Sequence, residues 1–408
     1  MRRLFALALL LCLALPARAE DADLVPLAAQ LAALRALPPD RLGERDGAPE
    51  LTVAKHLLRD WVEASLVSVD NADDARQLEQ PLNDRLRAAD LTCDSVSDPH
   101  GKRCDDQADG PLFSARGYLG SIRFMLPEAG GRLVLTTAAG IECGYDESAY
   151  VYERRDGAWH RIFESERNDY TKDGYRPQNF EQVLVSPKES GEQPLVLTTG
   201  ISPWCSSNWQ AVYYRLFRVA PDRAAAPALL DREEGIYAGV DQPVRSSLGR
   251  DEALIEFQDR SIDLDVFTRT MVRHFRVGAD DKVVRVAPFA FTPRAIVDEW
   301  LVRPSAESAL FTDRAARSRL QALHRRLHKD HIAVEYAEDG GRCRNDPTLW
   351  VIGVTPEHAA APLYFRLRWV APFDFTVLDI GPRKPAGCRA QPIALDETAQ
   401  QFPALSGQ

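Results

Sequence analysis

Short stretches in which apolar and polar residues alternate fill the middle of the chain, from residue 112 to about residue 293. Examples are "RLVLTT", "SAYVYERR" and "QAVYYRLFRV", which are rich in β-branched and aromatic residues and are separated by turn formers. A two-residue period of this kind is typical of β-strands with one buried face. In "YVYERRDGAWHRIF", Asp156-Gly157 suits a tight turn between two such strands. We therefore predict antiparallel sheet throughout this region, with a hairpin at residues 156–157.

The chain on either side of this region follows a helical period. Residues 20–90 are rich in Ala and Leu, and one segment places four apolar side chains near a common face, namely Val53, Leu57, Trp61 and Leu66. Asn71 is suited to cap a further helix, because its side chain can accept a hydrogen bond from a free backbone N–H. After residue 293 the pattern is again helical, and strand patterns return between residues 332 and 395.

One phrase is written twice in the strand region. "LVLTTAAGIEC" at residues 133–143 and "LVLTTGISPWC" at residues 195–205 share six of eleven positions at an offset of 62 residues. A more diverged third copy follows, in which "ALIEF" at residues 253–257 takes the place of "LVLTT". Each unit has room for about four strands, which is typical of tandem β repeats such as propeller blades.

These patterns predict an α+β, mainly β protein. Its sheets would be tandem antiparallel four-stranded meander repeats, with helices near the N-terminus and in the C-terminal region. The arrangement is propeller-like, but three recognisable units are too few for a ring, so the sequence leaves closure open. The expected divisions are a signal peptide, a helical region, a β-repeat region and a region of helix plus antiparallel strands, at residues 1–19, 20–90, 91–293 and 294–408.

The first nineteen residues have the features of a secretory signal peptide. Arg2 and Arg3 precede the apolar run "LFALALLLCLAL", and "ARA" suits cleavage before Glu20. The run is too short to anchor the chain, and no later stretch is long and apolar enough to span a bilayer. We therefore expect an exported protein, periplasmic or secreted, without a membrane anchor after cleavage.

Charge argues against nucleic acid as a partner. The signal segment holds three arginines and no acid, so the remainder carries 47 basic and 60 acidic residues, a net charge of −13. A chain of this charge is repelled by DNA, RNA and anionic membranes.

Six cysteines remain once Cys12 is removed with the signal peptide, namely Cys93, Cys104, Cys143, Cys205, Cys343 and Cys388. An even number in an oxidising compartment indicates disulfides, although six cysteines allow 15 pairings. Cys143 and Cys205 end the two copies of the repeated phrase, so we prefer that pairing, which would join adjacent units. Cys343 and Cys388 bracket the last strand section and could join its two ends.

Two segments resemble parts of metal sites, and no other cofactor is expected. In "DYTKDGY", Asp169 and Asp173 occupy positions one and five of a calcium loop, but Phe180 stands where its final acid belongs. In "HRRLHKDH", His324 and His328 are four residues apart, as zinc ligands on a helix often are. A hairpin turn and a basic last helical turn account for the same residues without calcium or zinc.

The segments around the repeated cysteines are the candidate ligand-binding surface. They carry aromatic rings, carboxylates and an amide, namely Tyr145, Asp146, Glu147, Trp204, Asn208 and Trp209. This composition suits a sugar or a peptide. Tryptophans beside a disulfide also occur in cores, so a structural role is the alternative.

No nucleophile elbow, phosphate-binding loop, dinucleotide motif or H-E-x-x-H sequence is present. This favours a disulfide-stapled binding or interaction protein of the bacterial cell envelope, whose partner is a protein, a peptide or a cell-wall glycan. The alternative is a periplasmic hydrolase that uses loop carboxylates on a glycan or peptide. Asp146 and Glu147 would be its first candidates.

Overall fold

A computed structural model describes fourteen stretches of the chain. They are residues 24–37, 49–92, 116–127, 131–141, 144–168, 178–187, 193–202, 209–219, 226–237, 244–262, 268–327, 333–357, 359–370 and 373–388. The chain divides into two compact units, residues 1–179 with 220–225 and residues 180–219 with 226–408.

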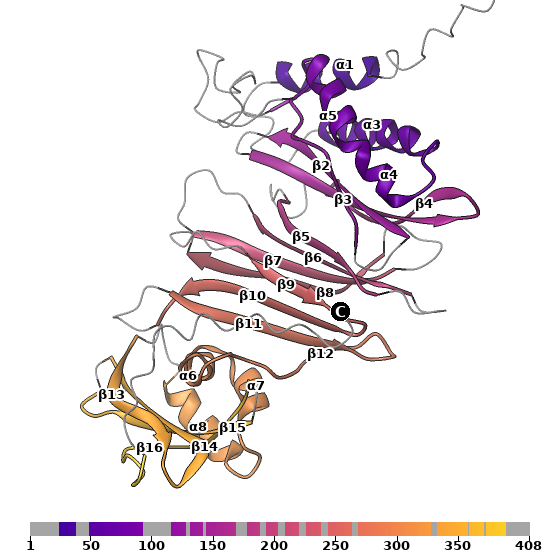
Figure 1. Cartoon of the computed structure of the whole chain (residues 1–408). Coiled ribbons are helices and arrows are strands. Elements are labelled where there is room, and N and C mark those ends of the chain that lie inside the picture. The colour runs from indigo at the N-terminus through magenta and orange to yellow at the C-terminus, as the bar shows by residue number, and fades with distance from the viewer. Residues whose placement is uncertain are drawn as a thin grey trace, which may run out of the picture. The chain divides into compact units, whose positions relative to one another are not determined.

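The first unit is a four-stranded sheet with helices on one face (Figure 1). Its helices are α1 (Val25–Ala36), α3 (Pro49–Leu66), α4 (Ala72–Gln77) and α5 (Glu79–Ala88). Its strands are β1 (Arg123–Met125), β2 (Arg132–Ile141), β3 (Gly144–Arg155) and β4 (Ala158–Ser165), in antiparallel order β1-β2-β3-β4. The core forms where the helices pack on Leu133, Leu135, Tyr150 and Tyr152.

Local sequence explains two details of this unit. Asp156 and Gly157 both have positive φ, as the predicted two-residue hairpin between β3 and β4 requires. Asn71 accepts a hydrogen bond from the backbone N of Asp74 at 2.8 Å and caps α4, also as predicted. On the predicted apolar face of α3, Trp61 and Leu66 are buried, but Val53 is 44% exposed, so the prediction was wrong at that position. Leu51, Leu58 and Val62 also belong to the buried face.

The second unit begins with two further meanders. The first contains β5 (Phe180–Val185), β6 (Leu195–Ser202), β7 (Trp209–Arg218) and β8 (Ala228–Tyr237). The second contains β9 (Arg245–Leu248), β10 (Glu252–Arg260), β11 (Thr268–Val277) and β12 (Val283–Arg285). The repeated phrase lies on β2 and β6, and its diverged copy on β10, so each copy is the second strand of its sheet.

Helices and a fourth meander complete the second unit. The helices are α6 (Pro293–Val302), α7 (Ser305–Ser308), a 3-10 turn (Ala309–Phe311) and α8 (Arg317–Leu327). The strands are β13 (Val334–Cys343), β14 (Asp346–Pro356), β15 (Leu363–Val370) and β16 (Asp374–Gly381). Apolar residues of α6 and of this sheet, among them Ile296, Trp300, Phe365 and Val377, share one core.

The predicted fold class is therefore confirmed: the protein is mainly β, with four antiparallel four-stranded sheets and several helices. The described strands form four separate sheets. No described helix combines the length and apolar character needed to cross a bilayer. The expected residue limits of the four divisions stay predictions.

A buried ionic network joins β8, β11, β12 and α6. Glu299 of α6 is 1% exposed and accepts hydrogen bonds from four guanidinium groups, those of Arg269, Arg273, Arg285 and Arg303. Glu234 of β8 binds Arg273 through both carboxylate oxygens, each at 2.6 Å, and Arg303 at 3.0 Å. Burial raises the pKa of Glu234, but the Arg273 charge and hydrogen bond outweigh it and hold the pKa below its usual value.

The Cys343–Cys388 disulfide that the sequence suggested is present and joins the end of β13 to the residues after β16. Cys93, Cys104, Cys143 and Cys205 lie outside the described residues, so the preferred Cys143–Cys205 pairing stays a prediction.

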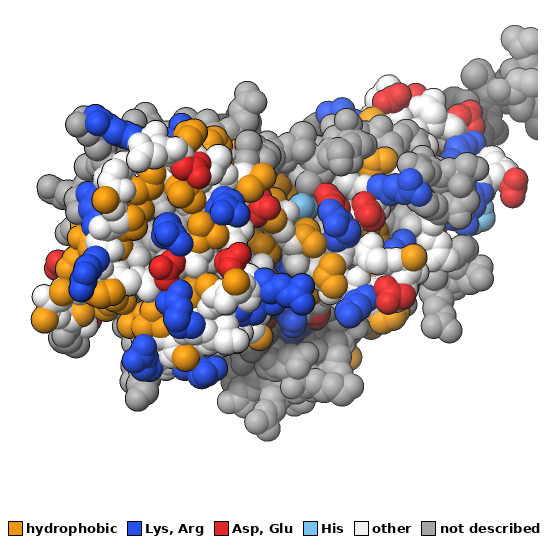
Figure 2. Space-filling view, turned by 90° about the horizontal axis from the view of Figure 1, so that it is seen from below, with side chains coloured by type: hydrophobic (Ala, Val, Ile, Leu, Met, Phe, Trp, Pro, Cys, Tyr) orange, Lys and Arg blue, Asp and Glu red, His pale blue; other side chains and the backbone are white. Residues whose placement is uncertain are grey.

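On the face that Figure 2 shows, Lys and Arg side chains are spread among hydrophobic and acidic ones.

Candidate functional site

Helix α3 and strand β3 face each other with polar as well as apolar side chains. Lys55, Arg59 and Glu63 are four residues apart, so they fall on one side of the helix. On β3, side chains alternate between faces, which places Asp146, Ser148, Tyr150 and Tyr152 together. Lys55 and Glu63 each contact a member of this strand set, so the interface between α3 and β3 is partly polar.

The Lys55–Asp146 pair lies at the buried end of this interface. Lys55 Nζ is 2.7 Å from Asp146 Oδ2, and the side chains are 1% and 0% exposed. Lys55 also donates to the Arg167 carbonyl at 2.6 Å, and Asp146 Oδ1 accepts from the Gln178 N–H at 2.9 Å. Asp146 therefore ties helix to sheet and is not placed to meet a ligand from solvent, contrary to its expected place on a binding loop.

Glu166, which directly follows β4, is a second polar centre beside α3. It accepts hydrogen bonds from His56 Nε2 at 2.9 Å, Arg59 Nη1 at 3.2 Å and Asn168 Nδ2 at 3.0 Å, and also from the Tyr150 hydroxyl. Burial raises the pKa of Glu166, but its hydrogen bonds and the nearby positive charges outweigh burial, so its pKa lies below the usual value. Glu166 is thus held as a carboxylate.

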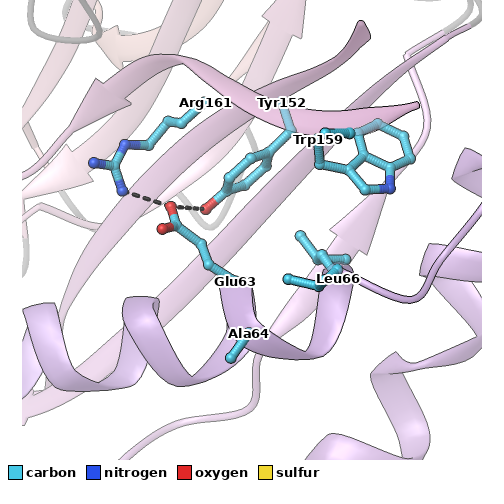
Figure 3. Close-up of a pocket in the computed structure, with 8 residues that line it drawn as sticks. Glu63, Ala64, Leu66, Tyr152, Trp159 and Arg161 are labelled. Carbon is cyan, nitrogen blue, oxygen red and sulfur yellow. Dashed lines mark hydrogen bonds and ion pairs between the residues drawn. The ribbon is translucent and has the colours of Figure 1, made fainter. Parts of the chain in front are cut away.

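A hollow of about 390 Å³ opens at the far end of the same interface. Its walls come from the last turns of α3, from β3 and from β4, and its lining residues are Glu63, Ala64, Leu66, Val67, Tyr152, Ala158, Trp159 and Arg161. Figure 3 shows the Glu63 carboxylate pointing from α3 toward Tyr152 and Arg161, while the Trp159 indole lies beside them, across from Leu66. The hollow therefore has one polar side and one aromatic side.

The polar side is an ordered group. Glu63 Oε1 accepts from the Tyr152 hydroxyl at 3.0 Å and from Arg161 Nη1 at 2.5 Å. Arg161 Nε also lies 3.3 Å from Glu164 Oε2. Burial, followed by the Glu63 charge, raises the pKa of Tyr152 well above its usual value, so its hydroxyl remains a donor.

The aromatic side is also held in place. The Trp159 indole N–H donates to the Val69 carbonyl at 3.0 Å, which links β4 to the segment after α3. The Arg154 guanidinium lies 5.9 Å from the centroid of the same ring. A fixed indole offers a flat apolar surface without the entropy cost of ordering it on binding.

The remaining predicted ligand-binding residues are placed as follows. Tyr145 and Glu147 are half-buried on β3 and face away from Asp146, because neighbouring residues of a strand alternate. The strand geometry therefore does not bring Asp146 and Glu147 together as a carboxylate pair. Trp209 begins β7, but its side chain lies outside the described residues, as do Trp204 and Asn208. Their ligand-binding role stays a prediction.

The metal hypotheses fall largely outside the described residues, which exclude Asp169, Asp173 and His328. His324 is buried on α8, where its Nδ1 lies 3.0 Å from Ser305 Oγ and its ring packs edge-on against Trp300. Within the described part of the chain, no group of three His, Cys, Asp or Glu side chains is arranged to hold a metal ion. Calcium and zinc stay predictions that rest on the sequence.

Sequence reasoning missed Glu63, Tyr152, Trp159 and Arg161. Two signals were available: the polar residues at four-residue intervals in "LTVAKHLLRDWVEASL", and the alternation in "DESAYVY". Both mark elements whose buried faces are partly polar. Neither signal shows that the two faces meet, because Glu63 and Tyr152 are 89 positions apart in the sequence.

Comparisons with known proteins do not assign the protein to a family. No protein-family model and no curated protein matches it. A solved structure described as a complex of BT0996 with RGII matches with a TM-score of 0.26 and 8% identity, over 63% of this protein and 72% of that one. This TM-score is too low to indicate a shared fold.

Proposed function

We propose that the protein is an exported binding protein of the bacterial cell envelope, and that the hollow between α3 and β4 binds a sugar unit of a cell-wall glycan. The observation that carries the proposal is the pairing of a fixed indole with an ordered polar group in one hollow. The signal segment supports export, and the disulfide suits an oxidising compartment.

A sugar ring has an apolar face of C–H groups and a rim of hydroxyls, and the hollow offers a partner for each. The Trp159 indole can cover the C–H face. Glu63 can accept from hydroxyl groups, since its Oε1 takes the bonds from both Tyr152 and Arg161 and an ionised carboxylate has room for about four. Arg161 and Tyr152 add donors.

The size of the hollow agrees with a small ligand. A volume of about 390 Å³ lies near the lower end of the range for small-molecule sites, roughly 300–1,000 Å³. The mixture of polar and apolar walls favours an amphipathic ligand over a purely apolar one.

Binding is favoured over the hydrolase alternative. A glycosidase needs two carboxyl groups roughly 5–10 Å apart across the bond to be cut. Glu63 is the only carboxylate among the described residues that line this hollow, and Arg161 neutralises it. Of the two hydrolase candidates from the sequence, Asp146 and Glu147, Asp146 is buried in an ion pair with Lys55.

Calorimetry with defined ligands tests the proposal. The purified protein is titrated with soluble peptidoglycan saccharides and, separately, with cell-wall stem peptides. We expect saccharide binding that Glu63→Gln and Trp159→Ala each weaken at least tenfold. Asp60→Asn is the matched control, because Asp60 is exposed on the same helix and does not line the hollow.

Three results would contradict the proposal. One is the absence of saccharide binding to protein that circular dichroism shows to be folded. Another is saccharide binding that neither variant weakens, which would place the ligand elsewhere. Peptide binding that depends on Glu63 and Trp159, without saccharide binding, would also overturn the glycan assignment.

A further inference from the structure

A second hollow adjoins the first, and Trp159 belongs to the wall of both. It has a volume of about 330 Å³, and its wall includes Asp70, Asn71, Gly131, Arg154 and Trp159. It is formed by the segment that joins α3 to α4, the end of β1 and the start of β2. Trp159 therefore lines two cavities of similar size within the first unit.

The two hollows repeat one chemical arrangement. In the first hollow, Glu63 and Arg161 form a carboxylate–guanidinium pair at 2.5 Å. In the second, Asp70 and Arg154 form such a pair at 3.1 Å, and the wall also contains Asp73 and Arg132. Each hollow thus combines the shared indole with at least one carboxylate–guanidinium pair, which supplies acceptors and donors.

The second hollow is open enough to take a ligand. The Asp70 side chain is 89% exposed, so most of its carboxylate surface is available. Gly131 has a φ of +82°, and a Cβ added there would meet no atom within 4 Å, so this part of the wall leaves free space.

The contacts that hold Trp159 also involve the wall of the second hollow. Arg154, which lines that hollow, donates to the Val69 carbonyl, which also accepts the Trp159 indole N–H. The same guanidinium donates to Asp70 and lies 5.9 Å from the centroid of the indole ring. The shared wall is therefore pre-organised, which reduces the cost of binding a ligand across it.

We infer that the ligand is a linear oligosaccharide of at least two units, and that it runs across Trp159 with one unit in each hollow. Similar walls on the two sides match a polymer of chemically similar units better than a single compact ligand. This inference rests on the proposed function, since it extends the same site.

A length series provides the test. N-acetylglucosamine oligomers of one to six units are titrated by calorimetry. We expect affinity to rise at least tenfold once a chain fills both hollows and then to level off. Glu63→Gln should weaken binding in the first hollow at every length, whereas Asp70→Asn should remove the gain with length and leave the single unit unaffected.

Asp84→Asn is the control for Asp70→Asn, because Asp84 is an exposed acid on α5 that lines neither hollow. Affinity that is independent of length, or an equal effect of Asp70→Asn at all lengths, would overturn this inference and leave the proposed function standing. Failure of every oligomer and peptidoglycan saccharide to bind would instead overturn the proposed function.

Discussion

Lys55 of α3 and Asp146 of β3 form an ion pair of 2.7 Å that is sealed from solvent. Each partner also forms a hydrogen bond with a backbone group, Lys55 with the Arg167 carbonyl and Asp146 with the Gln178 N–H. Removing either side chain would leave the charge of the other one buried and unpaired.

We predict that Lys55→Met and Asp146→Leu each destabilise the first unit by roughly 3 kcal/mol, because each leaves the other charge buried and unpaired. The double variant should lose less than the sum of the two, since it leaves neither charge. Urea denaturation of the four proteins measures this coupling. Additive losses would show that the pair contributes nothing specific.

Asp298 gives the second unit a pH dependence. Burial raises its pKa from 3.8 to about 6, against the opposing effects of the Arg269 charge and the Tyr336 hydrogen bond. The folded protein thus keeps a proton that the unfolded chain releases. Binding of this proton stabilises the folded state. The stabilisation is fully present below about pH 4 and is lost as the pH rises to about 6.

Asp298→Asn should remove that dependence, because the amide stays neutral and can still accept from Tyr336. The measurement is the free energy of unfolding of α6, obtained from its hydrogen-exchange protection in increasing urea at several pH values from 4 to 7. This free energy should fall by on the order of 3 kcal/mol over the interval in the wild type and by much less in the variant. An equal pH dependence in the two proteins would mean that Asp298 is ionised throughout.

Peptide mapping without reduction should find Cys343 joined to Cys388 and Cys143 joined to Cys205. The first bond is present in the structure. The second follows from the equivalent positions of the two cysteines in the repeated phrase. Cys143 linked to any other cysteine would refute the second pairing without affecting the first.

If the predicted signal peptide is cleaved as expected, the chain expressed in a Gram-negative bacterium will be found in the periplasm or the medium with Glu20 as its first residue. Intact mass and N-terminal sequencing measure both features. A chain that retains residues 1–19 in the cytoplasm would contradict the export assignment. Arg2→Glu with Arg3→Glu should slow processing, and Arg35→Glu in the mature chain is the control.

The sheets could be predicted because their signals are local. Alternation within a few residues marks each strand, and the turn at Asp156-Gly157 depends only on the backbone preferences of those two residues. The repeat added the strand order, since its copies on β2, β6 and β10 occupy the same place in each sheet.

The candidate site could not be predicted because its contacts are long-range. Glu63 meets Tyr152 across 89 positions and Arg161 across 98, and a helix face does not name the strand on which it packs. The same effect explains Asp146, which looks like a surface acid in the sequence but is matched by Lys55 across 91 positions.

The network around Glu299 constrains how this sequence can change over time. Loss of that one carboxylate would leave four arginines without their shared counter-ion, and no single substitution elsewhere restores it. Arg273 also forms an ion pair with Glu234, so replacing the network would require simultaneous substitutions on several strands and on α6. Among descendants of this gene, Glu234, Arg273 and Glu299 should persist together or disappear together.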